Sequence, residues 1–186
     1  MYLSDLNRFL VLMPEKKFFL TLRVIVYTPG LWIMFLNRFG KFLASKTKKN
    51  KILKPLAIVY NFLYFLVMLL TGIYLPIETK IGEGLYIGHW GAIVVHPETI
   101  IGDNCNLSQG VTLGEGGREK RGCPKIGDRV FIGPGAKIFG PITIGNDVAV
   151  GANAVVTKSL EDMAVVVGVP AKVISHRGSN DFVILE

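Results

Sequence analysis

The sequence predicts a mainly β protein, a left-handed parallel β-helix of about four coils that follows an α-helical N-terminal arm. Three observations support this fold: a six-residue repeat from Ile81 onward, a glycine after most repeated positions, and a preceding segment rich in apolar and basic residues. The pattern divides the 186 residues into an arm (1–75), a β-helix domain (76–176) with an interrupting loop (115–125), and a tail (177–186).

The repeat places a small aliphatic residue at one phase of six along the domain. Its twelve positions are Ile81, Ile87, Ile93, Ile101, Leu107, Leu113, Ile126, Ile132, Ile138, Ile144, Val150 and Val156. Each hexad is expected to form one short strand and one turn, and three hexads close a triangular coil. The aliphatic side chain points into a narrow interior, and the glycine that often follows permits a tight corner. An ordinary β-rich domain with scattered glycines would not keep this phase.

The N-terminal arm carries the positive charge of the chain. Residues 1–55 hold eleven lysines and arginines against Asp5 and Glu15, a net charge of +9, whereas residues 56–186 have a net charge of −2. Apolar and aromatic clusters over residues 17–45 predict helices, which Pro29-Gly30 separates. A basic segment, 46–51, then leads to a second apolar stretch, 56–70.

Two interpretations of this arm remain open. It either associates with an anionic membrane surface, or packs as a helical cap on the first coil and on neighbouring subunits. We favour the membrane surface over the cap, and either of them over a true transmembrane span, for which the apolar run 56–70 is short. A nucleic-acid partner is not expected, since the aromatic residues form apolar faces and do not alternate with basic ones. With only Cys105 and Cys123 and no secretory cleavage pattern, we expect a cytoplasmic protein, peripheral at the inner face of the cytoplasmic membrane.

The three histidines of the chain do not predict a metal site. His89 and His96 lie on different faces of the prism and His176 lies beyond the last coil, so they cannot converge on one ion. His89 comes two residues after the inward-facing Ile87, so its side chain is expected to project outward. A lone outward histidine is usually a surface residue, and its importance here rests on its neighbours.

Those neighbours carry a family resemblance. The stretches 88–95 (GHWGAIVV), 109–114 (QGVTLG), 123–128 (CPKIGD), 151–156 (GANAVV) and 167–174 (VGVPAKVI) resemble the serine acetyltransferase branch of the hexapeptide-repeat acyltransferases. The resemblance covers about residues 76–176 and leaves out the arm, which does not look like the large helical domain of true serine acetyltransferases. It implies a homotrimer that transfers an acetyl group directly from acetyl-CoA to a hydroxyl.

The resemblance also implies roles for particular residues. His89 matches the catalytic histidine, a general base for the attacking hydroxyl. The carboxylate that orients it in the family falls on Tyr74 here, so Glu78 is the nearest substitute. The residues expected to bind acetyl-CoA are Gly114, Gly133, Ala152, Lys158 and Lys172. Those expected near the acceptor are Gln109, Trp90, Arg118, Arg121 and Cys123, although Gln109 is equally consistent with an ordinary polar ladder and loop 115–125 with a solvated loop.

The acceptor is where the sequence departs from the family. An aspartate before the catalytic histidine and an Arg-His pair in the loop hold the amino acid in the family; here these positions are Gly88, Gly122 and Cys123. Burying the charges of a zwitterion without partners is costly. Members of this branch that lack the amino-acid clamp resemble the O-acetyltransferases of capsule, exopolysaccharide and lipopolysaccharide assembly. This resemblance implies a sugar hydroxyl as acceptor, with the arm delivering a lipid-linked saccharide without joining the chemistry. The alternatives are a serine O-acetyltransferase and a non-catalytic hexapeptide scaffold.

Overall fold

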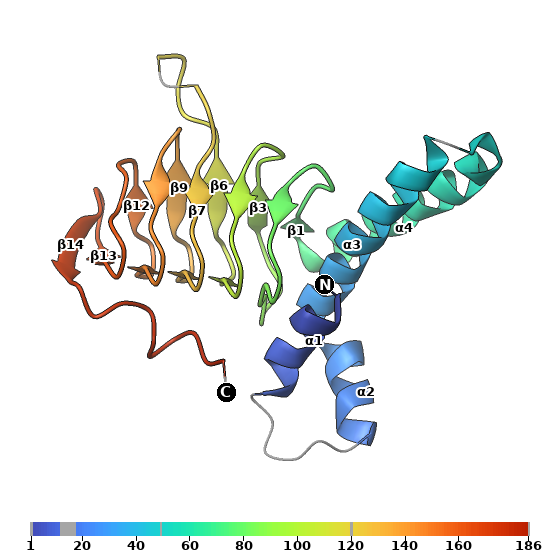
Figure 1. Ribbon diagram of the computed structural model, residues 1–186, viewed down its shortest axis with the longest axis horizontal. Coiled ribbons are helices and arrows are strands. Elements are labelled where there is room, and N and C mark those ends of the chain that lie inside the picture. The colour runs from blue at the N-terminus through green and yellow to red at the C-terminus, as the bar shows by residue number, and fades with distance from the viewer. Residues whose placement is uncertain (1, 12–17, 49, 120, 186) are drawn as a thin grey trace.

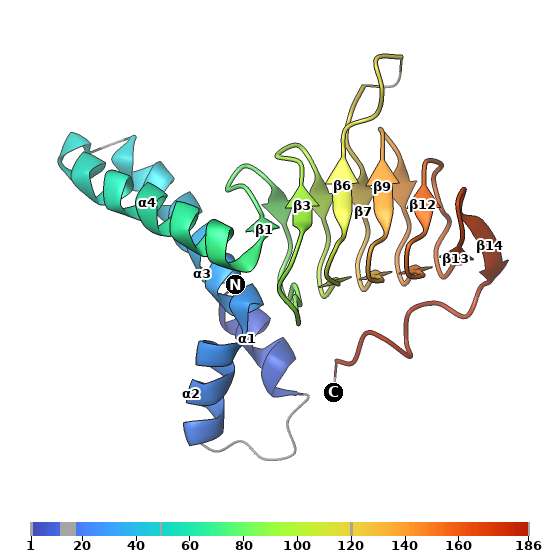
Figure 2. The ribbon, with the colours of Figure 1, turned by 180° about the vertical axis from the view of Figure 1, so that it is seen from behind.

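The computed structural model describes residues 2–11, 18–48, 50–119 and 121–185. Figure 1 shows a triangular prism of short strands, with a group of helices packed at its N-terminal end. The loop between β6 and β7 projects away from the coils, as Figure 2 shows from behind, and the chain beyond β14 runs back along the prism toward the helices. The predicted combination of a β-helix and a helical arm is confirmed.

Short strands recur along the whole prism. They are β1 (Ile73–Tyr74), β2 (Lys80–Ile81), β3 (Ile93–Val95), β4 (Ile100–Ile101), β5 (Asn106–Leu107), β6 (Thr112–Gly114), β7 (Lys125–Ile126), β8 (Phe131–Ile132), β9 (Lys137–Phe139), β10 (Thr143–Ile144), β11 (Ala149–Val150), β12 (Val155–Val156), β13 (Val165–Val167) and β14 (Lys172–Ser175).

Three sheets form the faces of the prism. They have the strand orders β1-β3-β6-β9-β12, β10-β7-β4-β2 and β14-β13-β11-β8-β5. Neighbouring strands in these three sheets run parallel, except that β13 and β14 are antiparallel. From β3 to β12 each face takes every third strand, as expected for the three strands per coil of the predicted left-handed β-helix.

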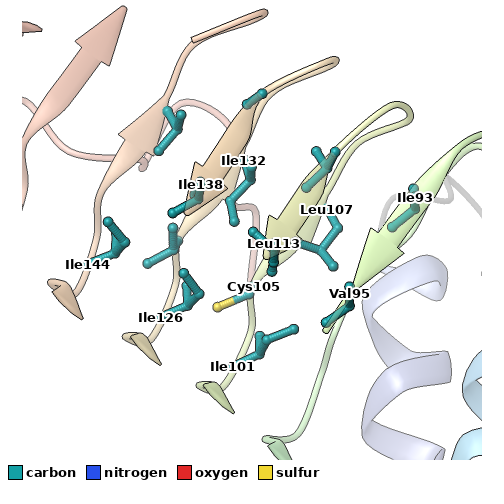
Figure 3. Packing of buried hydrophobic residues seen from close by; sticks show 14 of the residues in the cluster. Ile93, Val95, Ile101, Cys105, Leu107, Leu113, Ile126, Ile132, Ile138 and Ile144 are labelled. Atoms are coloured by element: carbon teal, nitrogen blue, oxygen red, sulfur yellow. The ribbon is translucent and has the colours of Figure 1, made fainter. Parts of the chain in front are cut away.

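The repeated aliphatic residues form the core of the prism. All twelve are buried, with exposed fractions between 0% and 7%. Figure 3 shows these side chains stacked coil upon coil, together with Cys105. Cys105 is fully buried, as expected of a small core residue, and burial raises the pKa of its thiol to about 12. Every hexad buries its repeated aliphatic residue, and most also bury the residue two positions earlier, which explains why the sequence period and the fold agree.

A ladder of side-chain oxygens supports one corner of the coils. Oδ1 of Asp103 accepts a hydrogen bond from the backbone N–H of Glu83 (2.6 Å), and Oδ1 of Asp128 accepts one from Asp103 (2.8 Å). Asn146 and Asp162 continue the series at 2.9 Å and 2.7 Å. Each of these side chains satisfies a backbone donor in the neighbouring coil, so the corner carries few unmet polar groups.

The arm consists of α1 (Tyr2–Leu10), α2 (Phe18–Tyr27), α3 (Pro29–Thr47), a short 3₁₀ turn (Lys51–Leu53) and α4 (Lys54–Thr71). The break between α2 and α3 falls at Pro29, as predicted. A Cβ added at Gly30 would come within 2.0 Å of the Ile87 carbonyl oxygen, so only glycine lets α3 approach the coil this closely.

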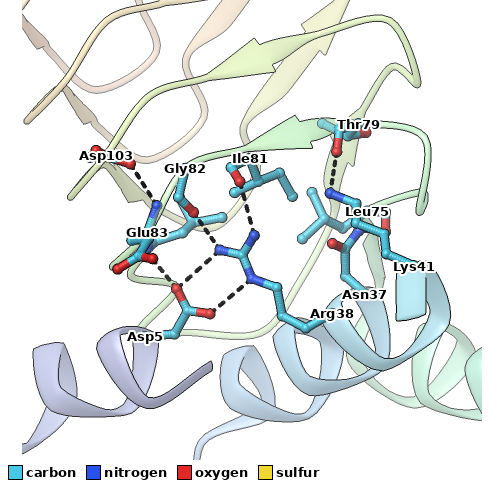
Figure 4. A network of polar contacts seen from close by, with 11 residues as sticks. Asp5, Asn37, Arg38, Lys41, Leu75, Thr79, Ile81, Gly82, Glu83 and Asp103 are labelled. Carbon is cyan, nitrogen blue, oxygen red and sulfur yellow. Dashed lines mark hydrogen bonds and ion pairs between the residues drawn. The ribbon is translucent and has the colours of Figure 1, made fainter. Parts of the chain in front are cut away.

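Polar contacts dock α1 and α3 on the first coil. The guanidinium of Arg38 pairs with Asp5 (Nε–Oδ2 3.1 Å) and donates to the carbonyl oxygens of Ile81 and Gly82 (Figure 4). Asn37 donates to the carbonyl of Pro76 at 2.8 Å. The ion pair is nearly inaccessible, with side chains 7% and 0% exposed. These helices therefore cap the first coil, which was one of the two interpretations left open.

The outer face of α4 has no partner within the described chain. α4 packs on α3 where Gly40 faces Tyr60, whose hydroxyl donates to the Leu36 carbonyl (3.1 Å). Its other side exposes large apolar residues, including Ile58, Phe62 and Leu69 at 70%, 61% and 67%. By length and composition alone, α4 is the one helix among the described residues that would suffice to cross a membrane.

Candidate active site

His89 stands at the rim of a hollow where three parts of the chain meet. The hollow has a volume of about 280 Å³. Its walls come from α1, from the first coils and from the C-terminal segment: Arg8, Tyr86, Gly88, His89, Asn106, Leu107, Ser108, Phe131, Phe182 and Ile184. His89 itself is exposed, as its outward position after Ile87 predicted. An exposed imidazole beside a concave surface can reach a small bound molecule.

Tyr86 shapes the floor of this hollow. A Cβ added at Gly88 would lie 2.9 Å from the Tyr86 ring, so the residue before His89 has no room for a side chain. The same ring packs on Phe9 of α1, with centroids 4.4 Å apart. An acidic side chain at position 88 would therefore overlap the Tyr86 ring, which packs against Phe9 of the arm helix α1.

Arg8 brings a positive charge into the same hollow. Its side chain is only 6% exposed, and Nη2 donates to Oδ1 of Asn106 at 2.6 Å. Its Nε and Nη1 atoms are buried without a hydrogen-bond partner among the described residues. The nearby carboxylate of Asp5 is already held by Arg38. Burial lowers the pKa of the Arg8 guanidinium, which reflects the cost of holding its charge away from water.

The C-terminal segment closes one side of the hollow. Asn106 donates through Nδ2 to the Phe182 carbonyl (2.9 Å), and the Phe182 ring stacks on Phe131 at 4.4 Å. Ser179 anchors the segment through a hydrogen bond to the Arg129 carbonyl. The segment predicted only as a tail (177–186) therefore supplies part of the wall.

The structure does not bring Glu78 to His89. Glu78 lines a separate hollow together with Lys80, Pro97 and Glu98. No carboxylate is among the described residues that line the His89 hollow. Glu78 and His89 therefore line different hollows within one chain, and a role for Glu78 in orienting His89 stays a prediction.

Gln109 and Trp90 lie near His89 without lining the hollow. Tyr86 pairs with Asn106, and continuing this register places Gln109 beside His89 in the next coil, as predicted. The side chain of Gln109 is nevertheless exposed, and Ser108 is the residue that contributes to the wall. Trp90 is 66% exposed. Their roles toward an acceptor stay predictions.

The loop residues lie elsewhere within one chain. Arg118 and Arg121 are exposed on the projecting loop. Cys123 is buried and lies 2.9 Å from Nδ1 of His96, which also accepts the backbone N–H of Glu98 at 3.2 Å. Because a backbone N–H only donates, Nδ1 is an acceptor and the Cys123 thiol donates to it. Burial raises the pKa of this thiol, so it is not an activated nucleophile.

The residues predicted to bind acetyl-CoA lie on the later coils. Gly133 and Ala152 are neighbours in successive coils, since a Cβ on Gly133 would lie 3.0 Å from the Ala152 nitrogen. Gly114 ends β6 under the Phe139 ring. Lys158 and Lys172 are exposed. No group of three or more His, Cys, Asp or Glu side chains with metal-ligand geometry occurs in the part of the chain that the structure describes.

Sequence reasoning missed Arg8, Tyr86 and Phe182. A weak signal was present for the first, because Asp5, Arg8 and Phe9 share one face of α1 at spacings of three and four, and all three are buried. Two charged residues beside an aromatic one on a single helical face indicate contacts with a partner surface. Nothing in the repeat pattern points to Phe182.

Comparisons with known proteins agree with this geometry. Residues 123–158 match the family model "Bacterial transferase hexapeptide (six repeats)". Serine acetyltransferase of Staphylococcus epidermidis is 36% identical over 159 residues, which cover 85% of this chain and 71% of that protein. The chain belongs to the serine acetyltransferase family. The Synechococcus elongatus enzyme is 32% identical over 84% of this chain, which spans 62% of that relative's length.

Solved serine acetyltransferases have the same architecture, including the arm. The Brucella abortus structure aligns with 95% of this chain and 68% of its own, with a TM-score of 0.80 and 26% identity. A complex of that enzyme with coenzyme A aligns with 95% of this chain and 67% of its own (TM-score 0.78, 25% identity). The Neisseria gonorrhoeae structure aligns with 94% of this chain and 64% of its own, with a TM-score of 0.76 and 28% identity. The expectation that the arm lies outside the family resemblance is therefore wrong.

The predicted sugar acceptor is also wrong. The relatives that match this family member over most of its length are named serine acetyltransferases, and the solved neighbours carry the same name. The sequence argument looked for charged partners of the amino acid only at the positions of Gly88, Gly122 and Cys123. In the structure, the cation of Arg8 lines the same hollow as His89 and comes from α1. The arm thus contributes Arg8 to the wall of the hollow, while the expectation that it takes no part in the chemistry stays a prediction.

Proposed function

We propose that the chain is an acetyl-CoA-dependent O-acetyltransferase whose acceptor is the hydroxyl of serine. The observation that carries this proposal is the placement of His89 and the buried cation of Arg8 in one hollow of about 280 Å³. A base and a fixed positive charge suit a small acceptor that carries a hydroxyl and a carboxylate. Serine acetyltransferases as relatives, one of them solved with coenzyme A, support the same reaction.

The chemistry needs one proton acceptor and no protein nucleophile. A neutral imidazole at His89 accepts the hydroxyl proton while that oxygen attacks the thioester carbonyl of acetyl-CoA. A carbon–oxygen bond forms, the carbon–sulfur bond breaks, and the CoA thiolate leaves and takes up the proton from the imidazolium. The thioester is already activated, so the buried thiols of Cys105 and Cys123 have no part in the transfer.

We propose a homotrimer with acetyl-CoA in the groove between two prisms. Gly133 and Ala152 form one corner of successive coils and line the proposed groove for the pantetheine chain, with Gly114 farther along and Lys158 and Lys172 toward the nucleotide phosphates. Arg118 and Arg121 do not line the hollow of their own chain, and the loop between β6 and β7 projects away from the coils (Figure 1), which suits a loop that reaches a neighbouring subunit. Light scattering tests this assembly; a monomer under assay conditions would contradict it.

We also propose that the outer face of α4 rests on an anionic membrane surface. Ile58, Phe62 and Leu69 expose an apolar face, and Lys46 and Lys54 lie at the far end of the α3–α4 hairpin, where anionic headgroups would attract them. Flotation with phosphatidylglycerol and phosphatidylcholine vesicles tests this. Binding to neither, or burial of α4 between copies of the chain, would contradict it. The location of the protein in the cell stays a prediction.

The test of the reaction is an acceptor panel. Purified protein with acetyl-CoA is offered L-serine, L-threonine or a neutral hexose, and thiol release is followed while mass spectrometry identifies the acetylated product. We expect O-acetylserine and the fastest thiol release with L-serine. Release that is no faster with serine than with water alone would contradict the proposal.

A further inference from the structure

We infer that Arg8, from the N-terminal arm, binds the carboxylate of the acceptor amino acid. The inference rests on the proposed function and extends it, since it assigns the determinant of acceptor specificity to an element outside the β-helix. Arg8 lines the same hollow as His89, and the opposite side of the hollow is closed by the C-terminal segment. One small molecule in this space would meet both side chains.

The first support is the unmet hydrogen-bonding capacity of Arg8. Its side chain is 6% exposed, and only Nη2 has a hydrogen-bond partner, Oδ1 of Asn106. Nε and Nη1 are buried and unpartnered in the described structure. Buried polar groups are normally satisfied, and a charged group without partners is among the most expensive to bury. A buried guanidinium that lines a hollow and leaves two nitrogen atoms without a partner indicates a site for an anionic ligand.

The second support is the character of the other walls. Apart from Arg8 and the imidazole of His89, the described lining residues are uncharged, and several are aromatic or aliphatic. No carboxylate competes for the guanidinium, because Asp5 is engaged by Arg38. A planar guanidinium presents parallel donors that match the two oxygens of a carboxylate. The ligand chemistry is therefore a small hydroxylated carboxylate, which the amino acid serine provides.

A purely structural role for Arg8 makes a different prediction. The hydrogen bond to Asn106 does help to hold α1, but α1 has other anchors in the Asp5–Arg38 ion pair and in the packing of Phe9 on Tyr86. Replacing a buried, incompletely paired charge by an apolar residue of similar length is often neutral or stabilising. Arg8→Met should therefore keep the melting temperature within a few degrees of wild type while acceptor use collapses.

The experiment compares two acceptors that differ only in the carboxylate. Kinetic constants are measured for L-serine and L-serinamide with wild type, Arg8→Met, Arg8→Lys and the control Arg23→Met, which alters an exposed arginine of α2. Wild type should prefer serine. Arg8→Met should lower kcat/KM for serine roughly 10- to 100-fold, mainly by raising KM, because the carboxylate loses its hydrogen bonds to a charged group. The serinamide constants and the KM for acetyl-CoA should stay unchanged, and Arg23→Met should match wild type.

The outcomes separate this inference from the proposed function. If wild type acetylates serine and Arg8→Met keeps the full preference for serine over serinamide, the Arg8 inference is overturned. If Arg8→Met does not fold, the Arg8→Lys variant decides. We expect Arg8→Lys to show a reduced preference for serine over serinamide, and an undiminished preference would overturn the inference. If wild type does not acetylate serine, the proposed function fails. Thermal shift then decides the Arg8 inference. If serine but not serinamide raises the melting temperature of wild type, and serine has no such effect on Arg8→Met, the inference is supported. If serine does not stabilise wild type in this way, the inference is overturned.

Discussion

Arg8 and Asn106 are joined by a 2.6 Å hydrogen bond between Nη2 and Oδ1 although 98 residues separate them along the chain. Asn106 also donates to the carbonyl of Phe182, so one amide connects the arm, the second coil and the C-terminal segment. These contacts place three distant parts of the chain around His89. The candidate site therefore depends on the docking of the arm as much as on the repeat.

The docking of α3 is expected to depend on Gly30. Gly30→Ala would bring a methyl group within 2.0 Å of the Ile87 carbonyl oxygen, and the helix must move to relieve the overlap. We expect a loss of about 1–3 kcal/mol in the free energy of unfolding, the usual cost of overpacking. Urea unfolding measures this, with Gly117→Ala as control because a methyl group there meets no atom within 4 Å. Equal stability of the two variants would contradict the close approach.

Lys41 should make stability depend on pH in the alkaline range. Burial lowers the pKa of this lysine from 10.5 to about 8, while its Nζ donates to the Thr79 carbonyl at 2.6 Å. Between these two values the unfolded chain holds a proton that the folded chain has released, so this group makes the free energy of unfolding rise with pH.

Lys41→Met should remove that contribution. Cys105, Tyr60 and Tyr64 have raised pKa values and act in the opposite direction, but they are common to both proteins and cancel in the difference. Urea unfolding of wild type and Lys41→Met on both sides of pH 8 gives this difference. Wild type should gain stability relative to the variant as the pH rises; parallel pH curves would show that Lys41 keeps an ordinary pKa.

Ala152 tests where acetyl-CoA binds. Its side chain is exposed at a corner of the later coils, so Ala152→Leu should fold normally and obstruct the proposed groove. We expect KM for acetyl-CoA to rise about tenfold, equivalent to roughly 1.4 kcal/mol, with little change in KM for serine. Initial rates at varied concentrations of each substrate measure both constants. A rise confined to serine would place the cofactor elsewhere.

The repeat made the β-helix predictable because every coil repeats one environment. Ile87, Leu107 and Ile132 occupy equivalent core positions, so each hexad is independent support for the same structure. His89 could be located for the same reason, since its outward direction follows from its distance to Ile87. The break at Pro29 was predictable from local backbone chemistry alone.

The remaining site residues depend on contacts that no period encodes. Arg8 reaches the hollow because α1 folds back on the first coil, and Phe182 because the last segment returns along the prism. Glu78 was assigned as the carboxylate nearest in sequence to Tyr74, but it lines a separate hollow with Lys80. The acceptor was misjudged because charges were sought only at aligned positions, whereas a cation can enter a site from a different element.

The most direct measurement of the central claim is the turnover of His89→Ala with acetyl-CoA and L-serine, followed as O-acetylserine by mass spectrometry. His176→Ala is the matched control, an exposed histidine beyond β14. Loss of a positioned base should lower kcat roughly 10²–10⁴-fold while acetyl-CoA binding by calorimetry stays near wild type, and the control should be fully active. Wild-type turnover in His89→Ala would contradict the assignment of this hollow as the active site.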